Sequence, residues 1–403
     1  MITSIGIMLI LGLAANSLFN RIHLPGLLGM ILLGIVMGPY GLNWLSPELL
    51  ENSADLRKFA LIVILLRAGL GISKADLKVV GSSAVKFSCI PGLLEGFTIA
   101  FLATQFLGFS FIEGGILGFI IAAVSPAIVV PQMLNLSEAG LGTNKGIPTL
   151  ILAGASIDDV FAITIFTTFL GLYSGSQVNI GVQLLGVPVS IVLGIGIGLV
   201  SGLALAKIFT RFHMRDTKKV LFILGVAILL TAIEGWLKDR VAVASLLGVM
   251  SLGFILLEKK PAVAKRLSQK FNKVWVLAEV FLFVLVGAEV NIGVALGAGL
   301  IGVLIIFIGL ISRSVGVLIA TAGSNLNWKE RLFCMIAYSP KATVQAAIGA
   351  IPLSLGVASG DVMLAIAVVA ILITAPLGAV GIEKTASILL EKATAASGVP
   401  MLS

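Results

Sequence analysis

The 403-residue sequence has few charged residues and few residues that bind metals. Asp, Glu, Lys and Arg make up 11% of it, and it contains two cysteines and two histidines. Because Cys89 and Cys334 both lie in apolar stretches, we expect two buried thiols rather than a disulfide or a metal pair. His23 and His213 are too few for a histidine-rich metal site. No nucleotide-binding motif is present, so we expect no ATP-driven step and no cofactor.

Hydrophobic residues, by contrast, make up 58% of the chain, and the mean hydropathy is +1.14. This composition is typical of a multi-spanning membrane protein, in which each helical span needs about 20 apolar residues. We expect thirteen spans, at 3–19, 24–40, 57–73, 83–107, 111–134, 147–173, 181–207, 218–236, 240–257, 271–289, 293–322, 330–352 and 361–383. Unbroken apolar runs such as 191–200 favour helices over barrel strands.

Lys and Arg are distributed unevenly between alternate loops, and cytoplasmic loops normally hold the excess. With the amino terminus outside, the inside loops hold most of them, whereas the outside loops keep only four, among them Arg57. This bias predicts an odd number of spans and a cytoplasmic carboxyl terminus, and it explains the +8 net charge without nucleic-acid binding. We expect the first run to be a retained helix rather than a cleaved signal, and the short loops favour a bacterial inner membrane.

Two neighbouring carboxylates, Asp158 and Asp159, lie inside the apolar run at 147–173. An ionised side chain near the bilayer midplane costs about 2.5 to 3.5 kcal/mol on insertion scales. Two together therefore indicate a wet cavity, a bound cation or a proton, and each of these points to ion transport. Adjacent helical residues point about 100° apart, so the two carboxylates cannot face one cavity equally.

Two Ser-Pro interruptions occur in apolar runs, at 125–131 and 339–345, and each has Val four residues after the Pro. If the seventh run is a linker, the remaining runs form two six-helix halves, and each interrupted run is the fifth of its half. An even number of spans per half and an odd linker make the two halves inverted. The alternative is a coincidental match in which each proline only kinks its helix.

The sequence resembles the monovalent cation/proton antiporters, specifically the two-aspartate sodium/proton branch that includes the mammalian sodium/hydrogen antiporters of the solute-carrier 9B group. The segments that carry the resemblance are 124–131, 145–150, 156–164 and 340–349, with weaker support from 67–71 and 287–290. The resemblance implies an all-α integral membrane protein with about thirteen transmembrane helices, arranged as two inverted repeats with two interrupted, crossing helices. It also implies a transporter rather than an enzyme, and a homodimer surrounded by membrane lipids.

The resemblance also assigns parts of the chain. The expected parts are scaffold and dimerisation helices at 1–74 and 218–289, core ion-transport helices at 79–173 and 293–383, a linker helix at 181–207, and a short cytoplasmic tail at 384–403.

By the resemblance, Asp159 is the main carrier of sodium or lithium and of protons, with Asp158 beside it. Cation and proton would then compete for one buried charge, so that binding of one requires release of the other. Together with alternating access, this competition produces antiport. Candidate additional oxygen ligands are Ser125, Gln132, Ser156 and Thr343. The alternative for each Ser and Thr is a hydrogen bond to its own helix.

Further charged residues lie in or near the core segments. Lys341, in the second interruption, could offset exposed carbonyl ends or repel a second cation, but the first interruption offers no carboxylate to balance it. Glu95 and Arg313 occupy equivalent places in the two halves and could pair, either as a structural bridge or in gating. Since arginine does not deprotonate in proteins, Arg313 is a poor proton carrier.

Outside these segments, a pair between Arg67 and Glu289 is conceivable, although each residue lies near a segment end where a long side chain can reach the interface.

Three other functions fit part of the pattern. A potassium/proton antiporter would use the same carboxylates. A passive cation channel could also use them, but it would show no obligatory exchange. A membrane aspartyl protease needs its two aspartates on facing elements, which two adjacent residues of one helix do not provide.

Overall fold

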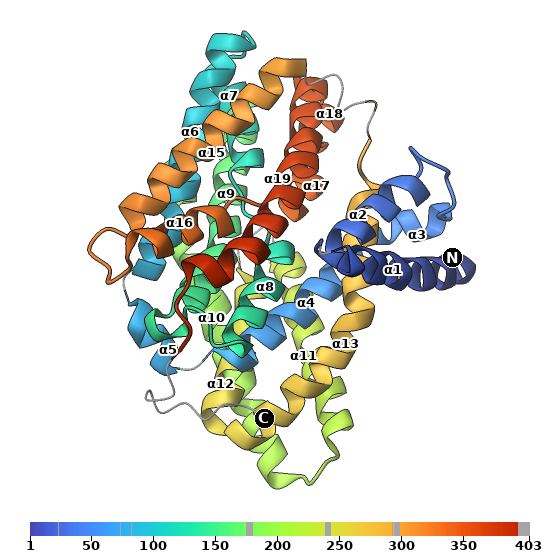
Figure 1. The fold of residues 1–403 in the computed structure, drawn as a ribbon, viewed down its shortest axis with the longest axis vertical. Coiled ribbons are helices and arrows are strands. Elements are labelled where there is room, and N and C mark those ends of the chain that lie inside the picture. The colour runs from blue at the N-terminus through green and yellow to red at the C-terminus, as the bar shows by residue number, and fades with distance from the viewer. Residues whose placement is uncertain are drawn as a thin grey trace. The chain divides into compact units, whose positions relative to one another are not determined.

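The computed structural model describes residues 1–22, 24–72, 74–81, 83–174, 180–237, 243–291, 293 and 299–393, and these are helical apart from loops and one isolated β-bridge (Figure 1). Among them, nine helices are long and apolar enough to cross a membrane. The chain divides into two compact units, each formed by two stretches of sequence. The first unit is Met1–Lys74 with Leu184–Val290, and the second is Ala75–Gln183 with Asn291–Ser403.

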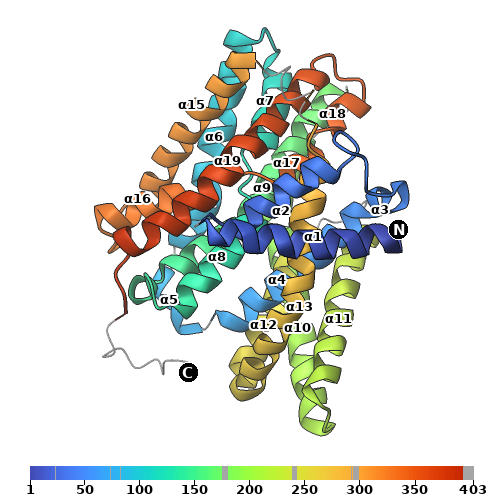
Figure 2. The same cartoon turned by 45° about the vertical axis from the view of Figure 1, so that its right-hand side comes forward.

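The first unit is held together by close helix contacts at small residues. Its helices are α1 (Ile2–Arg21), α2 (Gly26–Met37), α3 (Pro47–Glu51), α4 (Ser53–Gly71), most of α10 (Ile180–Arg211), α11 (Asp216–Leu237), α12 (Ser245–Lys259) and α13 (Pro261–Ala288). Figure 2 shows α1 lying across α13, which α2 and α4 also contact. A Cβ added to Gly34 of α2 would come within 2.0 Å of the Val284 carbonyl oxygen on α13. Glycine is therefore required there, as is common where membrane helices approach closely.

The second unit contains the two interrupted helices. Its elements are α5 (Lys74–Val80, from Ala75), α6 (Ser83–Phe106), α7 (Phe111–Ile121), α8 (Pro126–Glu138), the 3₁₀ turn η1 (Thr143–Lys145), α9 (Ile147–Tyr173), α15 (Gly299–Ala320), α16 (Trp328–Ala337), α17 (Thr343–Ile348), α18 (Ile351–Ser354) and α19 (Gly360–Leu389). Helix α6 packs against α7, α9 and α15, and Figure 1 shows α15 running beside α6. The 18 residues around the first break, 114–131, are all buried, so this part of the first interrupted helix lies inside the unit.

The predicted interruptions are confirmed, and both have local causes. Helix α7 ends at Ile121 and α8 begins at Pro126, where a missing N–H is no loss because the first helical N–H groups have no intrahelical partner. Helix α16 ends at Ala337 and α17 begins at Thr343, with Pro340 between them.

A further likeness between the interrupted helices escaped sequence reasoning. Each begins with a capping box, formed by Ser110 with Glu113 in α7 and by Asn327 with Glu330 in α16. A Ser or Asn followed three residues later by Glu was the available sequence signal. The match at their starts strengthens the correspondence between the two repeats.

Several predicted boundaries differ from the observed ones. The run at 330–352 is divided among α16, α17 and α18, and the run at 240–257 is helical only from Ser245, with 240–242 outside the described residues. The range predicted as a tail, 384–403, begins as helix because α19 continues to Leu389, and 394–403 are not described. Most of the range predicted as a linker falls in the same compact unit as 1–74. The roles assigned to these ranges remain predictions.

Candidate functional site

The break between α7 and α8 exposes backbone carbonyls that need donors, because the last carbonyls of a helix have no intrahelical partner. The Gln345 amide of α17 donates to the carbonyls of Ile120 and Ala123, each at 2.9 Å. Arg313 donates to the Ala122 carbonyl through Nη2, and Lys341 Nζ lies 3.4 Å from the same oxygen. Two cations therefore lie at the carboxyl end of α7, where the helix dipole is negative.

Four charged side chains meet at this break, and each is at most 1% exposed. We call them the four-charge cluster: Glu95, Asp158, Arg313 and Lys341. Glu95 accepts from Arg313 Nε and, at 2.7 Å, from Lys341 Nζ. Arg313 Nη2 lies 3.5 Å from Asp158 Oδ2. In their ionised forms these four groups carry no net charge, and their contacts run continuously from Lys341 to Asp158.

Close packing of α6 and α15 brings Arg313 to Glu95. Gly316 lies three residues after Arg313, on the same face of α15. A Cβ added to Gly316 would come within 2.6 Å of Pro91 Cα on α6, so the two helices nearly touch at this point. The predicted pairing of Glu95 with Arg313 is present in the structure.

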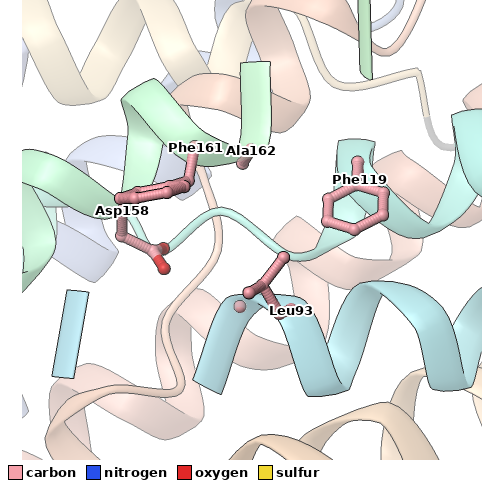
Figure 3. A pocket seen from close by; sticks show the side chains of 6 residues that line it. Leu93, Phe119, Asp158, Phe161 and Ala162 are labelled. Atoms are coloured by element: carbon pink, nitrogen blue, oxygen red, sulfur yellow. The ribbon is translucent and has the colours of Figure 1, made fainter. Parts of the chain in front are cut away.

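The Asp158 carboxylate interacts with other groups of the protein. Its Oδ2 accepts a hydrogen bond from the Val124 N–H of the first break at 2.9 Å. Figure 3 shows its carboxylate at a small pocket lined by Gly92, Leu93, Phe119, Asp158, Phe161 and Ala162. Across this pocket Gly92 leaves room, since an added Cβ there would lie 2.7 Å from Asp158 Oδ1. Asp158 thus binds both the unwound backbone and the four-charge cluster.

Asp159 is placed differently from its neighbour. Its Oδ1 is buried, and within the described part of the chain no group forms a hydrogen bond with it. The two carboxylates therefore have unequal surroundings, as the angle between adjacent helical residues requires. Of the two aspartates, Asp159 is the one with an unpaired buried oxygen, and in the four-charge cluster Glu95 Oε1 is likewise without a partner among the described residues.

The four candidate oxygen ligands fall into two groups. Ser125 and Thr343 meet where the breaks cross, with their hydroxyl oxygens 3.4 Å apart, and the Ser125 N–H donates to the Pro340 carbonyl at 2.8 Å. Gln132 donates to the Ala379 carbonyl at 3.4 Å. Ser156 donates to the Leu152 carbonyl at 2.9 Å, which is a bond within its own helix. The structure thus brings Ser125 and Thr343 together and directs Gln132 elsewhere.

Two expectations about charge need correction. Lys341 does have a carboxylate partner, but it is Glu95 from α6 rather than a residue of the first interruption. In the first unit, Glu289 pairs with Arg57 rather than with Arg67, because Arg57 lies inside α4 with Nη1 3.0 Å from Glu289 Oε2. The Arg67 guanidinium instead lies 5.9 Å from the centre of the Trp275 ring.

Comparisons with known proteins agree with this architecture. The family described as sodium/hydrogen exchanger, transmembrane, matches residues 5–386. Sodium/hydrogen exchanger 9B2 of Homo sapiens is 33% identical over 387 residues, covering 92% of this chain and 70% of that protein. Its counterpart in Xenopus tropicalis is 34% identical over 408 residues, covering 96% and 75%.

Among solved structures, two of the sodium proton antiporter MjNhaP1 from Methanocaldococcus jannaschii match with TM-scores of 0.73 and 0.76, at 22% and 20% identity. Each match covers 96% of both chains and therefore shows a shared fold. The extent of the family match and the identity to the exchangers lead to one conclusion: this chain is a member of the sodium/hydrogen exchanger family.

Proposed function

We propose that this protein exchanges sodium or lithium for protons by alternating access, with both ions competing for Asp159. The observation that carries the proposal is the unequal state of the two aspartates. Asp158 belongs to a cluster with no net charge and accepts a backbone N–H, whereas Asp159 has a buried oxygen without a partner in the described ranges. Asp159 is half-buried, but burying one carboxylate oxygen without a partner is already costly, so Asp159 needs a proton or a cation.

This charge balance also favours exchange of one cation for one proton. The four-charge cluster is neutral without Asp159, so the site carries a single excess negative charge when Asp159 is ionised. Either one alkali cation or one proton removes that charge, and the two cannot both be held without leaving an excess positive charge. Competition for one charge makes exchange obligatory, which separates this mechanism from a channel.

The proposal includes a role for the break. Carboxylate and hydroxyl oxygens suit hard cations. Ser125 and Thr343 would add neutral oxygens where the interrupted helices cross, and Asp158 would hold the unwound backbone in position. We further propose a homodimer in the cell membrane, with the amino terminus outside and the carboxyl terminus cytoplasmic.

Reconstitution in liposomes tests the function. A pH gradient is imposed, a trapped fluorescent reporter follows it, and sodium, lithium or potassium is added to wild type and to Asp159→Asn. We expect sodium or lithium to collapse the gradient in wild type and no cation to do so in Asp159→Asn. Asp361→Asn is the matched control, because Asp361 is exposed in the first turn of α19 and should exchange like wild type.

The same experiment can overturn the proposal. If wild type responds to no cation, the exchange function is wrong, and if only potassium is effective, the substrate is wrong. Equal activity of wild type and Asp159→Asn removes Asp159 as the carrier. Wild type and Asp159→Asn must have the same melting temperature in detergent. Loss of exchange in the variant is then not caused by loss of its fold.

A further inference from the structure

Tyr338 carries a buried hydroxyl group that has no role in the function proposed above. It follows the last residue of α16 and is the first residue of the second break. The side chain is 0% exposed, and its Oη finds no hydrogen-bond partner among the residues the structure describes. Buried hydroxyls in native proteins are nearly always paired, so an unpaired one needs an explanation such as a ligand or water.

The ring of Tyr338 is fixed by its neighbours. Its centre lies 4.3 Å from the centre of the Phe87 ring on α6, and the Arg313 guanidinium lies 5.0 Å from the ring centre. Both contacts involve the ring rather than the hydroxyl, so the hydroxyl can still bind a ligand. The position of the oxygen is therefore determined by packing.

The hydroxyl faces α9 one turn before the aspartates. A Cβ added to Gly154 would lie 2.6 Å from Phe87 Cδ1 and 3.0 Å from Tyr338 Oη, so the absence of a side chain at Gly154 makes room for the Phe87 ring and for this oxygen. Asp158 lies four residues further on, on the same face and about 6 Å along the axis. Asp158, Asp159 and Arg313 are the charged groups that act electrostatically on the Tyr338 hydroxyl.

We propose that the Tyr338 hydroxyl is a ligand of the transported cation, and that the Gly154 turn of α9 places it on the Asp158 side of an ion whose charge Asp159 balances. The inference rests on the proposed function. A cation the size of sodium resembles Ca²⁺, whose oxygen ligands lie at about 2.4 Å, so two oxygens on one ion are up to about 5 Å apart. Asp158, one helical turn after Gly154 on the same face, is the carboxylate that this separation suits, so the hydroxyl would reach the ion from the Asp158 side.

A neutral ligand fits the charge balance of the site. The hydroxyl adds an oxygen without adding charge, so it stabilises the bound cation while one proton still suffices to replace that cation. Because packing fixes the ring, the oxygen cannot follow ions of different radius. Tyr338 would therefore help to set the preference between sodium and lithium.

Tyr338→Phe is the direct test, since it removes the hydroxyl and keeps the ring against Phe87 and Arg313. In proteoliposomes we expect the KM for sodium to rise about fivefold, as for loss of one modest polar interaction, with the maximal rate within about twofold of wild type. The ratio of the sodium KM to the lithium KM should also change. Tyr173→Phe is the matched control: its hydroxyl accepts the Ala358 N–H at 3.2 Å at the far end of α9, and it should leave both KM values unchanged.

A second variant keeps the test independent of Tyr338 itself. Gly154→Ala would push on the Phe87 ring and on the hydroxyl of Tyr338, which packs against that ring, and it should also raise the sodium KM. Stabilisation of detergent-solubilised protein by added sodium, measured as a shift in melting temperature, should need more sodium in both variants.

Different results separate the two proposals. If wild type exchanges, Asp159→Asn does not, and Tyr338→Phe keeps wild-type KM values and ion preference, only the role of Tyr338 is overturned. A lower maximal rate or melting temperature with unchanged KM values would likewise make Tyr338 a packing residue. Absence of exchange in folded wild type overturns the proposed function and this inference with it.

Discussion

The break between α7 and α8 needs donors, whereas the break between α16 and α17 supplies them. In the first, the carbonyls of Ile120, Ala122 and Ala123 accept from side chains of other elements. The second supplies side-chain donors, Lys341 and Gln345, and its own Lys341 N–H donates to the Thr374 hydroxyl at 2.9 Å. One backbone bond runs the other way, because the Pro340 carbonyl accepts from the Ser125 N–H of the first break. The two repeats thus share a backbone arrangement and differ in chemistry.

The difference traces to two positions of the shared Ser-Pro pattern. Counting from the serine, Lys341 corresponds to Ala127 and Gln345 corresponds to Pro131. Lys341 and Gln345 are the side chains of the second break that bind the first. The two breaks cross because the two repeats share a backbone arrangement. Their side chains differ, and the positive charge and the side-chain donors both come from the second break. The proposed exchange of a single cation uses this asymmetry, because in that proposal Asp159 is the carboxylate without a counter-charge.

The largest effect on this comparison should come from Arg313→Met. The substitution leaves Asp158 without its cation and removes a donor from the Ala122 carbonyl. Removing one partner from a buried charged group typically costs about 3 to 5 kcal/mol in the free energy of unfolding. We expect a large fall in the melting temperature in detergent and loss of exchange.

Two controls accompany this substitution. Arg331→Met removes a half-buried arginine of α16 that donates to the Leu326 carbonyl, and its effect should be small. Adding Glu95→Gln to Arg313→Met restores a cluster without net charge, so the double variant should melt above the single one. If the double variant melts lower still, charge balance is not what holds the cluster together.

Gln345→Leu should have the next largest effect, because it leaves several carbonyls of the first break without a donor. An unsatisfied buried polar group costs about 1 to 3 kcal/mol. Gln132→Leu is the matched control, since half-buried Gln132 makes one longer bond, at 3.4 Å, to the Ala379 carbonyl. Melting temperatures of the two variants should differ clearly, and equal values would mean that Gln345 does not stabilise the break.

The sequence predicted those parts of this site that depend on a local pattern of residues. Proline marked both breaks, and charge in an apolar run marked Asp158 and Asp159. Equivalent positions in two repeats predicted the pairing of Glu95 with Arg313, which needed only that α6 and α15 pack against each other.

Other contacts depend on which helix lies beside which break, and no local pattern encodes that. Glu95 accepts from Lys341, far along the chain, because α6 passes the second break. Glu289 pairs with Arg57 because Arg57 is helical and buried, whereas its charge suggested a loop. Gln345 was visible as a polar residue in an interrupted helix, yet its acceptors could be identified only from the crossing.

The smallest effect should come from Thr374→Val, which acts on the second break alone. The Thr374 hydroxyl accepts the Lys341 N–H and donates to the Ala370 carbonyl within α19. Thr385→Val is the matched control, because Thr385 makes only the equivalent intrahelical bond, to the Gly381 carbonyl, among the contacts the structure describes for it. The difference between the two variants isolates the bond to the second break, and we expect about 1 kcal/mol in the free energy of unfolding.

Exchange kinetics decide what that bond does. If the second break only supplies donors to the first, loosening its backbone by Thr374→Val should lower the maximal rate slightly and leave the sodium KM unchanged, since the Lys341 side chain keeps its contacts with Glu95 and Ala122. A changed KM with unchanged stability would instead make the second break part of the cation site, and the division of roles between the two breaks would then be wrong.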